Sequence, residues 1–276
     1  MSARSRADLA GARRVVVKVG SSSISGDNAG KIDSLVDALA GAHARGTEVV
    51  LVSSGAIATG MPFLRLDERP TDLATQQAAA AVGQNVLVYR YQSALRGYGI
   101  VAGQVLLTAG DFEDPTHRSN ARRAMERLLG LRILPIVNEN DTVATHEIRF
   151  GDNDRLAALV ARLTGADALV LLSDIECLYT RPPSEPDARP IREVRYGDDL
   201  SEFEFGATVV NSVGTGGAAT KASAARLAAD GGVAALVTSI DLAAEALGGA
   251  DIGTWFEANP APTVTPGTGS IGVSAA

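Results

Sequence analysis

The chain has 276 residues, of which 46% are hydrophobic and 21% charged, and its formal net charge is −7. This apolar content excludes an intrinsically disordered chain, and the length allows one large domain or two small ones. The acidic balance, without a long Lys/Arg run, argues against a nucleic-acid-binding protein. A single cysteine, Cys177, excludes an internal disulfide, and three histidines argue against a histidine-based metal site. No run of 18 apolar residues and no signal peptide is found, so we expect a soluble, cytoplasmic protein without a membrane partner.

Short β-branched runs alternate with longer Ala- and Leu-rich stretches along most of the chain. The short runs predict strands at residues 15–19, 49–52, 100–107, 133–137, 168–172, 233–238 and 252–258. The longer stretches predict helices at 31–45, 73–96, 120–129, 155–163, 220–229 and 242–247, with a further helix starting at Ala56. Strands that are apolar on both faces and alternate with helices are typical of a parallel sheet covered on both sides. The sequence therefore predicts an α/β fold.

Two segments interrupt this rhythm. Residues 181–190 contain four prolines and predict a surface loop outside any helix or strand. Residues 259–276 are rich in Pro, Thr, Gly and Ser and predict a disordered tail.

Small polar residues follow nearly every predicted strand. They lie in six segments: 18–23, 53–55, 138–141, 151–154, 173–174 and 214–221. Ordinary turns also favour Gly, Asn, Asp and Ser, which would explain any one of these segments. Because ligands bind outside the carboxyl ends of the strands in open α/β sheets, the six together favour a ligand-binding edge.

Two lysines stand out at this edge. Lys18 interrupts an apolar strand, so we expect it near the strand end with an anionic partner, unless it only extends its amine to solvent at the sheet edge. The glycine-rich segment 214–220 leads into an Ala-rich helix, whose first amide groups can cradle an anion, and Lys221 adds a positive charge. Its spacing does not fit a Walker A loop. The two lysines together suggest a clamped polyphosphate.

Acidic and amide residues form the third set. Residues 138–141 are Asn-Glu-Asn-Asp, and one of Asp152, Asn153 and Asp154 is expected to cap the helix that follows. The surplus residues could orient lysines, bind a magnesium–nucleotide complex, or hold a substrate ammonium group.

The combined motifs 18–22, 53–60, 137–143, 151–154, 173–174 and 214–221 resemble the glutamate 5-kinases, a branch of the amino acid kinase family, in the family's order over residues 13–257. The resemblance implies a three-layer αβα sandwich with a mainly parallel sheet. It also implies one kinase domain at 1–258, in which 13–165 bind mainly glutamate and 166–258 mainly the nucleotide. The implied reaction transfers the γ-phosphoryl group of ATP to the side-chain carboxylate of L-glutamate, the first step of proline biosynthesis. ATP would bring Mg²⁺, with no metal ligands from the chain itself; proline would be a feedback inhibitor, and the protein a homo-oligomer.

Carried over by position, the resemblance assigns a role to each motif residue. It implies that Lys18 and Lys221 stabilise the transferring phosphoryl group and that Asp154 organises them. The implied glutamate-binding residues are Ser54, Gly55, Asp141 and Asn153. The implied nucleotide-binding residues are Lys18, Ser173, Asp174, Thr215, Gly216, Gly217, Ala218, Ala219, Thr220 and Lys221. Ala218 departs from the family pattern, in which methionine is expected, and the C-terminal RNA-binding-like module of many relatives is expected to be absent.

Other functions remain open at this stage. A related kinase could act on N-acetylglutamate or aspartate, and a catalytically silent amino-acid sensor could keep the same pocket. A Rossmann oxidoreductase is disfavoured because no strand is followed by GxGxxG. A carboxylate nucleophile has an ordinary pKa of about 4.3 and needs no general base at neutral pH, which fits motifs without histidine.

Overall fold

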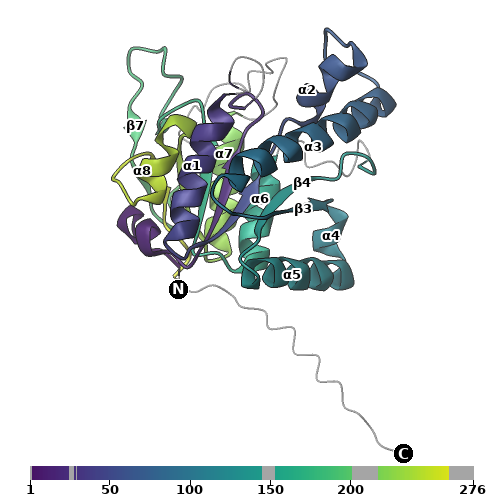
Figure 1. Cartoon of the computed structure of the whole chain (residues 1–276). Coiled ribbons are helices and arrows are strands. Elements are labelled where there is room, and N and C mark those ends of the chain that lie inside the picture. The colour runs from purple at the N-terminus through teal and green to yellow at the C-terminus, as the bar shows by residue number, and fades with distance from the viewer. Residues whose placement is uncertain (1, 25–27, 29, 145–152, 201–216, 261–276) are drawn as a thin grey trace, which may run out of the picture.

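An eight-stranded sheet, in the order β3-β4-β2-β1-β5-β9-β10-β8, runs through the computed structural model, which describes residues 2–24, 28, 30–144, 153–200 and 217–260 (Figure 1). Its strands are β1 (Arg14–Val19), β2 (Glu48–Val52), β3 (Ala102–Leu107), β4 (Leu134–Glu139), β5 (Ala168–Ser173), β8 (Glu193–Val194), β9 (Ala234–Ser239) and β10 (Thr254–Phe256). Neighbouring strands are parallel, except that β10 runs antiparallel to β9. A small antiparallel pair joins β6 (Leu178–Tyr179) to β7 (Pro190–Ile191).

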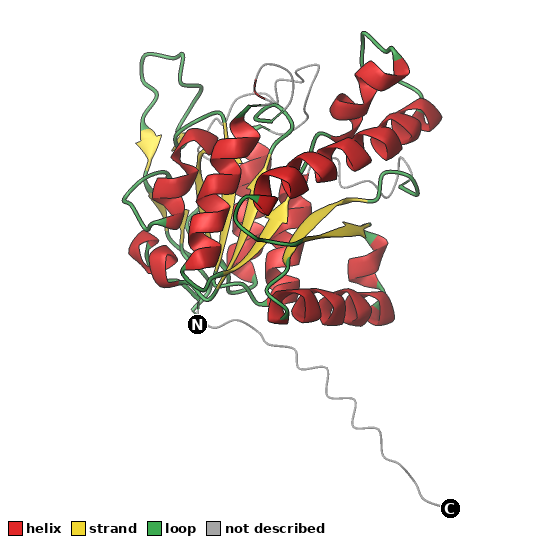
Figure 2. Ribbon diagram, in the orientation of Figure 1, coloured by secondary structure: helices red, strands yellow, loops and turns green. Residues whose placement is uncertain are grey.

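Helices cover both faces of the sheet (Figure 2). The longer ones are α1 (Lys31–Ala44), α3 (Leu73–Arg96), α5 (Pro115–Gly130), α6 (Asn153–Thr164) and α7 (Ala218–Asp230). The shorter ones are η1 (Arg6–Gly11), α2 (Ala56–Gly60), η3 (Met61–Leu64), α4 (Gly110–Glu113), η4 (Ile240–Leu242) and α8 (Ala243–Leu247). Successive side chains of β1 point to opposite faces, so Val15, Val17 and Val19 pack with α1, α8 and part of α3. Val16 packs with α5, α6 and α7 in a second core. The predicted αβα sandwich is confirmed.

Tertiary context changes several expected elements. Strand β3 is an edge strand with half-exposed and exposed positions, so the expectation that every strand is covered on both faces is wrong there. Helix α5 begins at Pro115, five residues before the predicted start, because Asp114 caps it by accepting from the Thr116 and His117 amides, both at 2.8 Å. Pro190 is not part of the predicted loop but is the first residue of β7. Proline is tolerated at the start of a strand because no N–H is needed there.

The predicted tail starts later than expected. The Asn259 amide donates to the Ala229 carbonyl at 2.9 Å, so residue 259 is still attached to the body. Residues 261–276 lie outside the described part, and their predicted disorder stays a prediction.

Helices α2 and α3 meet backbone to backbone. A Cβ added at Gly83 of α3 would lie 1.8 Å from the Ala56 carbonyl oxygen, and one at Gly60 of α2 would lie 1.9 Å from the Ala79 carbonyl oxygen. No side chain fits either position. These two glycines therefore hold α3 directly beside the segment that follows β2.

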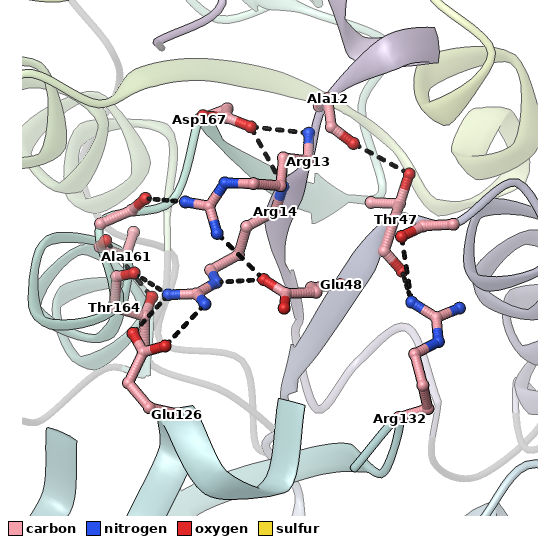
Figure 3. A network of polar contacts seen from close by, with 12 residues as sticks. Ala12, Arg13, Arg14, Thr47, Glu48, Glu126, Arg132, Ala161, Thr164 and Asp167 are labelled. Atoms are coloured by element: carbon pink, nitrogen blue, oxygen red, sulfur yellow. Dashed lines mark hydrogen bonds and ion pairs between the residues drawn. The ribbon is translucent and has the colours of Figure 1, made fainter. Parts of the chain in front are cut away.

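The buried guanidinium of Arg14 links several elements at the opposite edge of the sheet, where the central strands begin (Figure 3). Arg14 at the start of β1 donates from Nε to Glu48 of β2 at 2.8 Å. It also binds both oxygens of Glu126 of α5, at 2.6 and 2.9 Å. The Asp167 carboxylate accepts from the Arg13 and Arg14 amides at 2.7 and 3.0 Å. This network fixes α5 and the start of β5 against the central strands β1 and β2.

We predict that Glu126→Gln lowers the Tm at pH 7 and that this deficit shrinks in acid. The hydrogen bond from Arg14 lowers the pKa of Glu126 from its ordinary value of 4.5. The carboxylate therefore stabilises the fold above about pH 4.5, and this contribution is lost as the pH falls through the folded-state pKa. Because the Glu126 side chain is 44% exposed, we expect a shift of only a few degrees. Thermal melts between pH 7 and 3 test this, with exposed Glu185→Gln as the control; a deficit constant over this range would contradict it.

Candidate active site

Three buried charges meet at the carboxyl end of β1. Lys18 lies on the same face of β1 as Val16, which is the face covered by α6 and α7. Its Nζ forms an ion pair with Asp154 in the first turn of α6. Lys221 in the first turn of α7 approaches the other carboxylate oxygen at 3.1 Å. The exposed fractions are 2% for Lys18, 1% for Asp154 and 5% for Lys221, so solvent exposure at the sheet edge does not explain Lys18.

The start of α7 is arranged around the same carboxylate. The Thr220 hydroxyl lies 3.4 Å from Asp154 Oδ2 and 2.9 Å from the Gly217 carbonyl oxygen, and the Gly217 amide donates to that hydroxyl at 3.0 Å. Ala218 and Ala219 follow in the first turn, half-buried and exposed respectively. Thr215 and Gly216 lie outside the described residues. The first turn of a 13-residue helix thus lies beside two lysines, an arrangement that favours an anion.

A chain of amides extends from α6 toward α3. Asn153 donates from Nδ2 to the Ser53 carbonyl at 2.7 Å and to Asn138 Oδ1 at 2.6 Å. Asn138 in turn donates to Gln84 Oε1 of α3 at 2.5 Å. Asn153 and Asp154 lie inside α6, which begins at Asn153, and Asp152 lies outside the described residues, so the expectation that one of the three caps the helix stays a prediction. The Asn153 and Asp154 side chains bind other elements.

The segment after β2 is fixed from two sides. The Ser53 hydroxyl lies 3.1 Å from the hydroxyl of Tyr91 of α3, and burial raises the pKa of Tyr91 and keeps its hydroxyl neutral. Gly55 adopts φ +89°, and a Cβ there would lie 3.3 Å from Ser21 Cβ, so the segments after β1 and β2 pack closely. Ser54 is half-buried between these fixed points.

A cavity of about 270 Å³ opens beside this chain, between α2, α3 and the ends of β3 and β4. Its wall consists of Ala56, Ala80, Ala81, Gln84, Asn85, Gln104, Leu106, Glu139, Asn140, Asp141 and Thr142. Of the four expected glutamate-binding residues only Asp141 lines it. Asn153 is connected to it through Asn138 and Gln84, while Ser54 and Gly55 directly precede Ala56.

Ser173 and Asp174 lie on the other side of Lys18. Ser173 ends β5, which neighbours β1, and Asp174 follows it. The Ser173 hydroxyl donates to Asp174 Oδ1 at 3.0 Å. The strand order β4-β2-β1-β5-β9 thus separates the expected glutamate-binding residues from the expected nucleotide-binding ones, with Lys18 between them.

The described residues offer no ready metal cage, since they hold no group of three His, Cys, Asp or Glu side chains arranged for a metal. Both oxygens of Asp154 face ammonium groups. Within the same described ranges, no helix combines the length and apolarity needed to cross a membrane.

Sequence reasoning missed Gln84 and Tyr91. Both lie on the buried face of α3, together with Ala80, Leu87 and Leu95. A glutamine at a core-facing helical position is the signal that could have pointed to Gln84, because a buried amide needs partners. Tyr91 carries no comparable signal, since a buried tyrosine also fits ordinary core packing.

Comparison with known proteins agrees with this arrangement. The model of the amino acid kinase family matches residues 13–239. The glutamate 5-kinase of Clavibacter sepedonicus is 72% identical over 93% of this chain and 98% of the relative. That of Leifsonia xyli subsp. xyli is 68% identical over 93% and 95%, and that of Salinispora arenicola is 55% identical over 90% and 69%. The solved structure of carbamate kinase from Giardia lamblia bound to AMP-PNP has a TM-score of 0.67 at 16% identity, covering 91% of this chain and all of that one.

The chain therefore belongs to the amino acid kinase family. Within that family it groups with the glutamate 5-kinases. Its sequence identity to them is far higher than the identity between proteins that share only a fold. The family resemblance of the motifs is confirmed, while the roles of the single site residues stay predictions.

We predict that Asp154→Asn destabilises the nucleotide-free protein. The substitution leaves two buried ammonium groups without their shared carboxylate, and breaking a buried ion pair in this way costs about 3–5 kcal/mol. A non-hydrolysable ATP analogue should reduce the difference in Tm between the variant and the wild type, because its phosphates supply negative charge at the same place. Thermal melts with and without the analogue measure both effects, with exposed Asp187→Asn as the control. An unchanged Tm without nucleotide would contradict a shared counter-ion.

Proposed function

We propose that this chain transfers the γ-phosphoryl group of ATP to the side-chain carboxylate of L-glutamate, giving L-glutamyl 5-phosphate and ADP. This is the first step of proline biosynthesis and the reaction for which its relatives are named. The observation that carries the proposal is the buried centre of Lys18, Asp154 and Lys221, which joins the end of β1 to the first turns of α6 and α7, with an amide-lined cavity at the ends of the strands β3 and β4.

The chemistry needs positioning and charge neutralisation more than proton transfer. A glutamate side chain is ionised at neutral pH, so it attacks the γ-phosphorus as it stands, and the bond to the bridging oxygen of ADP breaks. Lys18, Lys221 and the amides of the first turn of α7 would stabilise negative charge on the phosphoryl oxygens. Magnesium bound to the nucleotide would add further positive charge.

Asp154 would act as the organiser of the two lysines. Two ammonium groups at one buried place repel each other, and a carboxylate between them reduces this repulsion and fixes both positions. Both ammonium groups would then be held where the phosphoryl group of an anionic substrate can meet them.

The remaining residues are proposed to act on either side of this centre. Asp141 and Asn153 would bind glutamate together with Ser54 and Gly55, while the nucleotide would lie along Ser173, Asp174 and residues 215–221. Residues 13–165 and 166–258 would then form mainly the glutamate and nucleotide parts. Feedback inhibition by proline, a homo-oligomer and a cytoplasmic location are further expectations from the family.

The alternatives are less well supported. A kinase for N-acetylglutamate or aspartate would keep the same lysine centre, but the highly identical relatives are named for glutamate. A silent sensor would have no reason to keep two lysines buried around one aspartate.

We predict that Lys18→Ala and Lys221→Ala each reduce kcat about 10²-fold or more, with a much smaller effect on the KM for glutamate. Both charges matter most where negative charge redistributes in the transition state. Steady-state ATP consumption with glutamate measures this, and Lys31→Ala, an exposed surface ion pair with Asp241, is the matched control. Near-normal kcat in either variant would contradict the role of that lysine.

We predict that the wild type prefers free glutamate over N-acetylglutamate by about 10- to 100-fold in kcat/KM. The acetylated acid lacks the ammonium group that Asp141 in the cavity wall is proposed to bind, so it would lose this charged contact. Aspartate is one methylene shorter and should react poorly. Asp141→Asn should raise the KM for glutamate while changing that for ATP little. Preference for the acetylated acid would favour the alternative kinase, and weaker ATP binding in Asp141→Asn would assign the residue to the nucleotide.

A further inference from the structure

The cavity wall contains one buried hydrogen-bond donor that the proposed mechanism has not used. Gln84 of α3 is 8% exposed and lines the cavity. Its Oε1 accepts from Asn138 at 2.5 Å, but its Nε2 has no hydrogen-bond partner among the described residues. Burying an amide N–H without a partner is costly, so such groups are rare in native proteins.

The polarity of this amide follows from the backbone. The Glu139 N–H donates to Asn138 Oδ1 at 2.9 Å, which fixes that atom as the acceptor oxygen. Asn153 Nδ2 donates to the same oxygen at 2.6 Å, so both of its lone pairs are used. Asn138 can therefore reach Gln84 only through its own NH₂ group, and Gln84 must accept with Oε1. An amide flip of Gln84 would place two NH₂ groups against each other, so Nε2 is the atom that remains as a hydrogen-bond donor.

The position of this donor is as firmly set as its polarity. Gly83 holds α3 against the Ala56 carbonyl, and Tyr91 two turns later binds Ser53. Gln84 lies between these two contacts. A loose surface glutamine could turn its amide to solvent, but this one is held by its neighbours on both sides.

The other residues of the cavity wall indicate which group of a ligand this donor would bind. Glu139 and Asp141 place two carboxylates in the wall, which suits an ammonium group but repels an anion. A substrate that carries an ammonium and a carboxylate on the same carbon atom therefore needs a donor beside them. The side-chain carboxylate of that substrate must instead reach Lys18 and Lys221, and neither lysine lines the cavity.

We propose that Gln84 Nε2 binds the α-carboxylate of the amino-acid substrate and so selects substrates with a free α-carboxylate. The inference rests on the proposed function, since it names a contact for the same substrate. Asn153 and Asp154 are consecutive in α6, so the amide chain that orients Gln84 and the lysine centre share one anchoring turn.

The test compares L-glutamate with L-glutamate α-amide, in which only the α-carboxylate is neutralised. Gln84→Glu keeps an acceptor oxygen for Asn138 and replaces the outward donor by a negatively charged acceptor of the same size. We expect it to lower kcat/KM for glutamate about 10- to 100-fold, because a hydrogen bond to a charged group is replaced by repulsion. The α-amide can donate to the new carboxylate, so its kcat/KM should change by less than about threefold. The preference for glutamate over the α-amide should therefore fall by at least about threefold.

Two further variants keep the result interpretable. Gln92→Glu, two turns later on the exposed side of α3, makes the same change of charge and should leave both substrates unaffected. Gln84→Met removes the donor without adding charge and should also reduce the preference for glutamate, which tests the inference if Gln84→Glu does not fold.

The outcomes separate the two levels of the proposal. The role of Gln84 would be overturned if the Gln84 variants lost kcat/KM equally for glutamate and its α-amide. It would also be overturned if the wild type did not prefer glutamate over the α-amide. Either result would leave the kinase function standing. A wild type that consumes ATP with neither compound would overturn the proposed function, and this inference with it.

Discussion

The shared ion pair of Asp154 with Lys18 and Lys221 is the constraint on which the rest of the structure depends. Charges this deeply buried are tolerated only when their counter-ions lie at contact distance. The pair therefore requires β1, α6 and α7 to meet at one point, although their residues are up to about 200 positions apart in the chain. Because β1 is central in the sheet, this point has strands on both sides that can supply different substrates.

The start of α6 divides the polar groups between two tasks. Asp154 turns toward the lysines, whereas Asn153 joins the Ser53 carbonyl to the amide chain that ends at Gln84. One helical turn thus fixes the proposed phosphoryl-transfer site and the proposed substrate-recognition site relative to each other. For a phosphoryl transfer that depends on alignment, this rigid connection accounts for the buried polar groups better than stability does, since apolar side chains would pack there at less cost.

Most of the fold and the lysine centre could be predicted from the sequence, but the contacts between distant helices and strands could not. The central strands were predictable because β1, β5 and β9 are buried along their whole length, and Lys18 was conspicuous within one of them. The antiparallel direction of β10 and the exposure of β3 depend on position in the sheet, which local patterns do not encode. Gln84 escaped notice because its partner Asn138 is 54 residues away in the chain. The close approach of Gly83 to Ala56, which sets where α3 lies, is not visible in local sequence patterns either.

The two buried ionic clusters at opposite ends of β1 show how structure and function can be told apart. At the amino end, the Arg14 guanidinium donates to Glu48, to Glu126 and to the backbone, and both carboxylates are still partly exposed to water. That cluster is satisfied by the protein itself and holds elements together. At the carboxyl end, Lys18 and Lys221 both contact the Asp154 carboxylate in a place where water contributes little. Burying three charges side by side costs stability, and such costs are typical of functional sites. The lysine cluster, and not the Arg14 cluster, is therefore the one expected to meet phosphate.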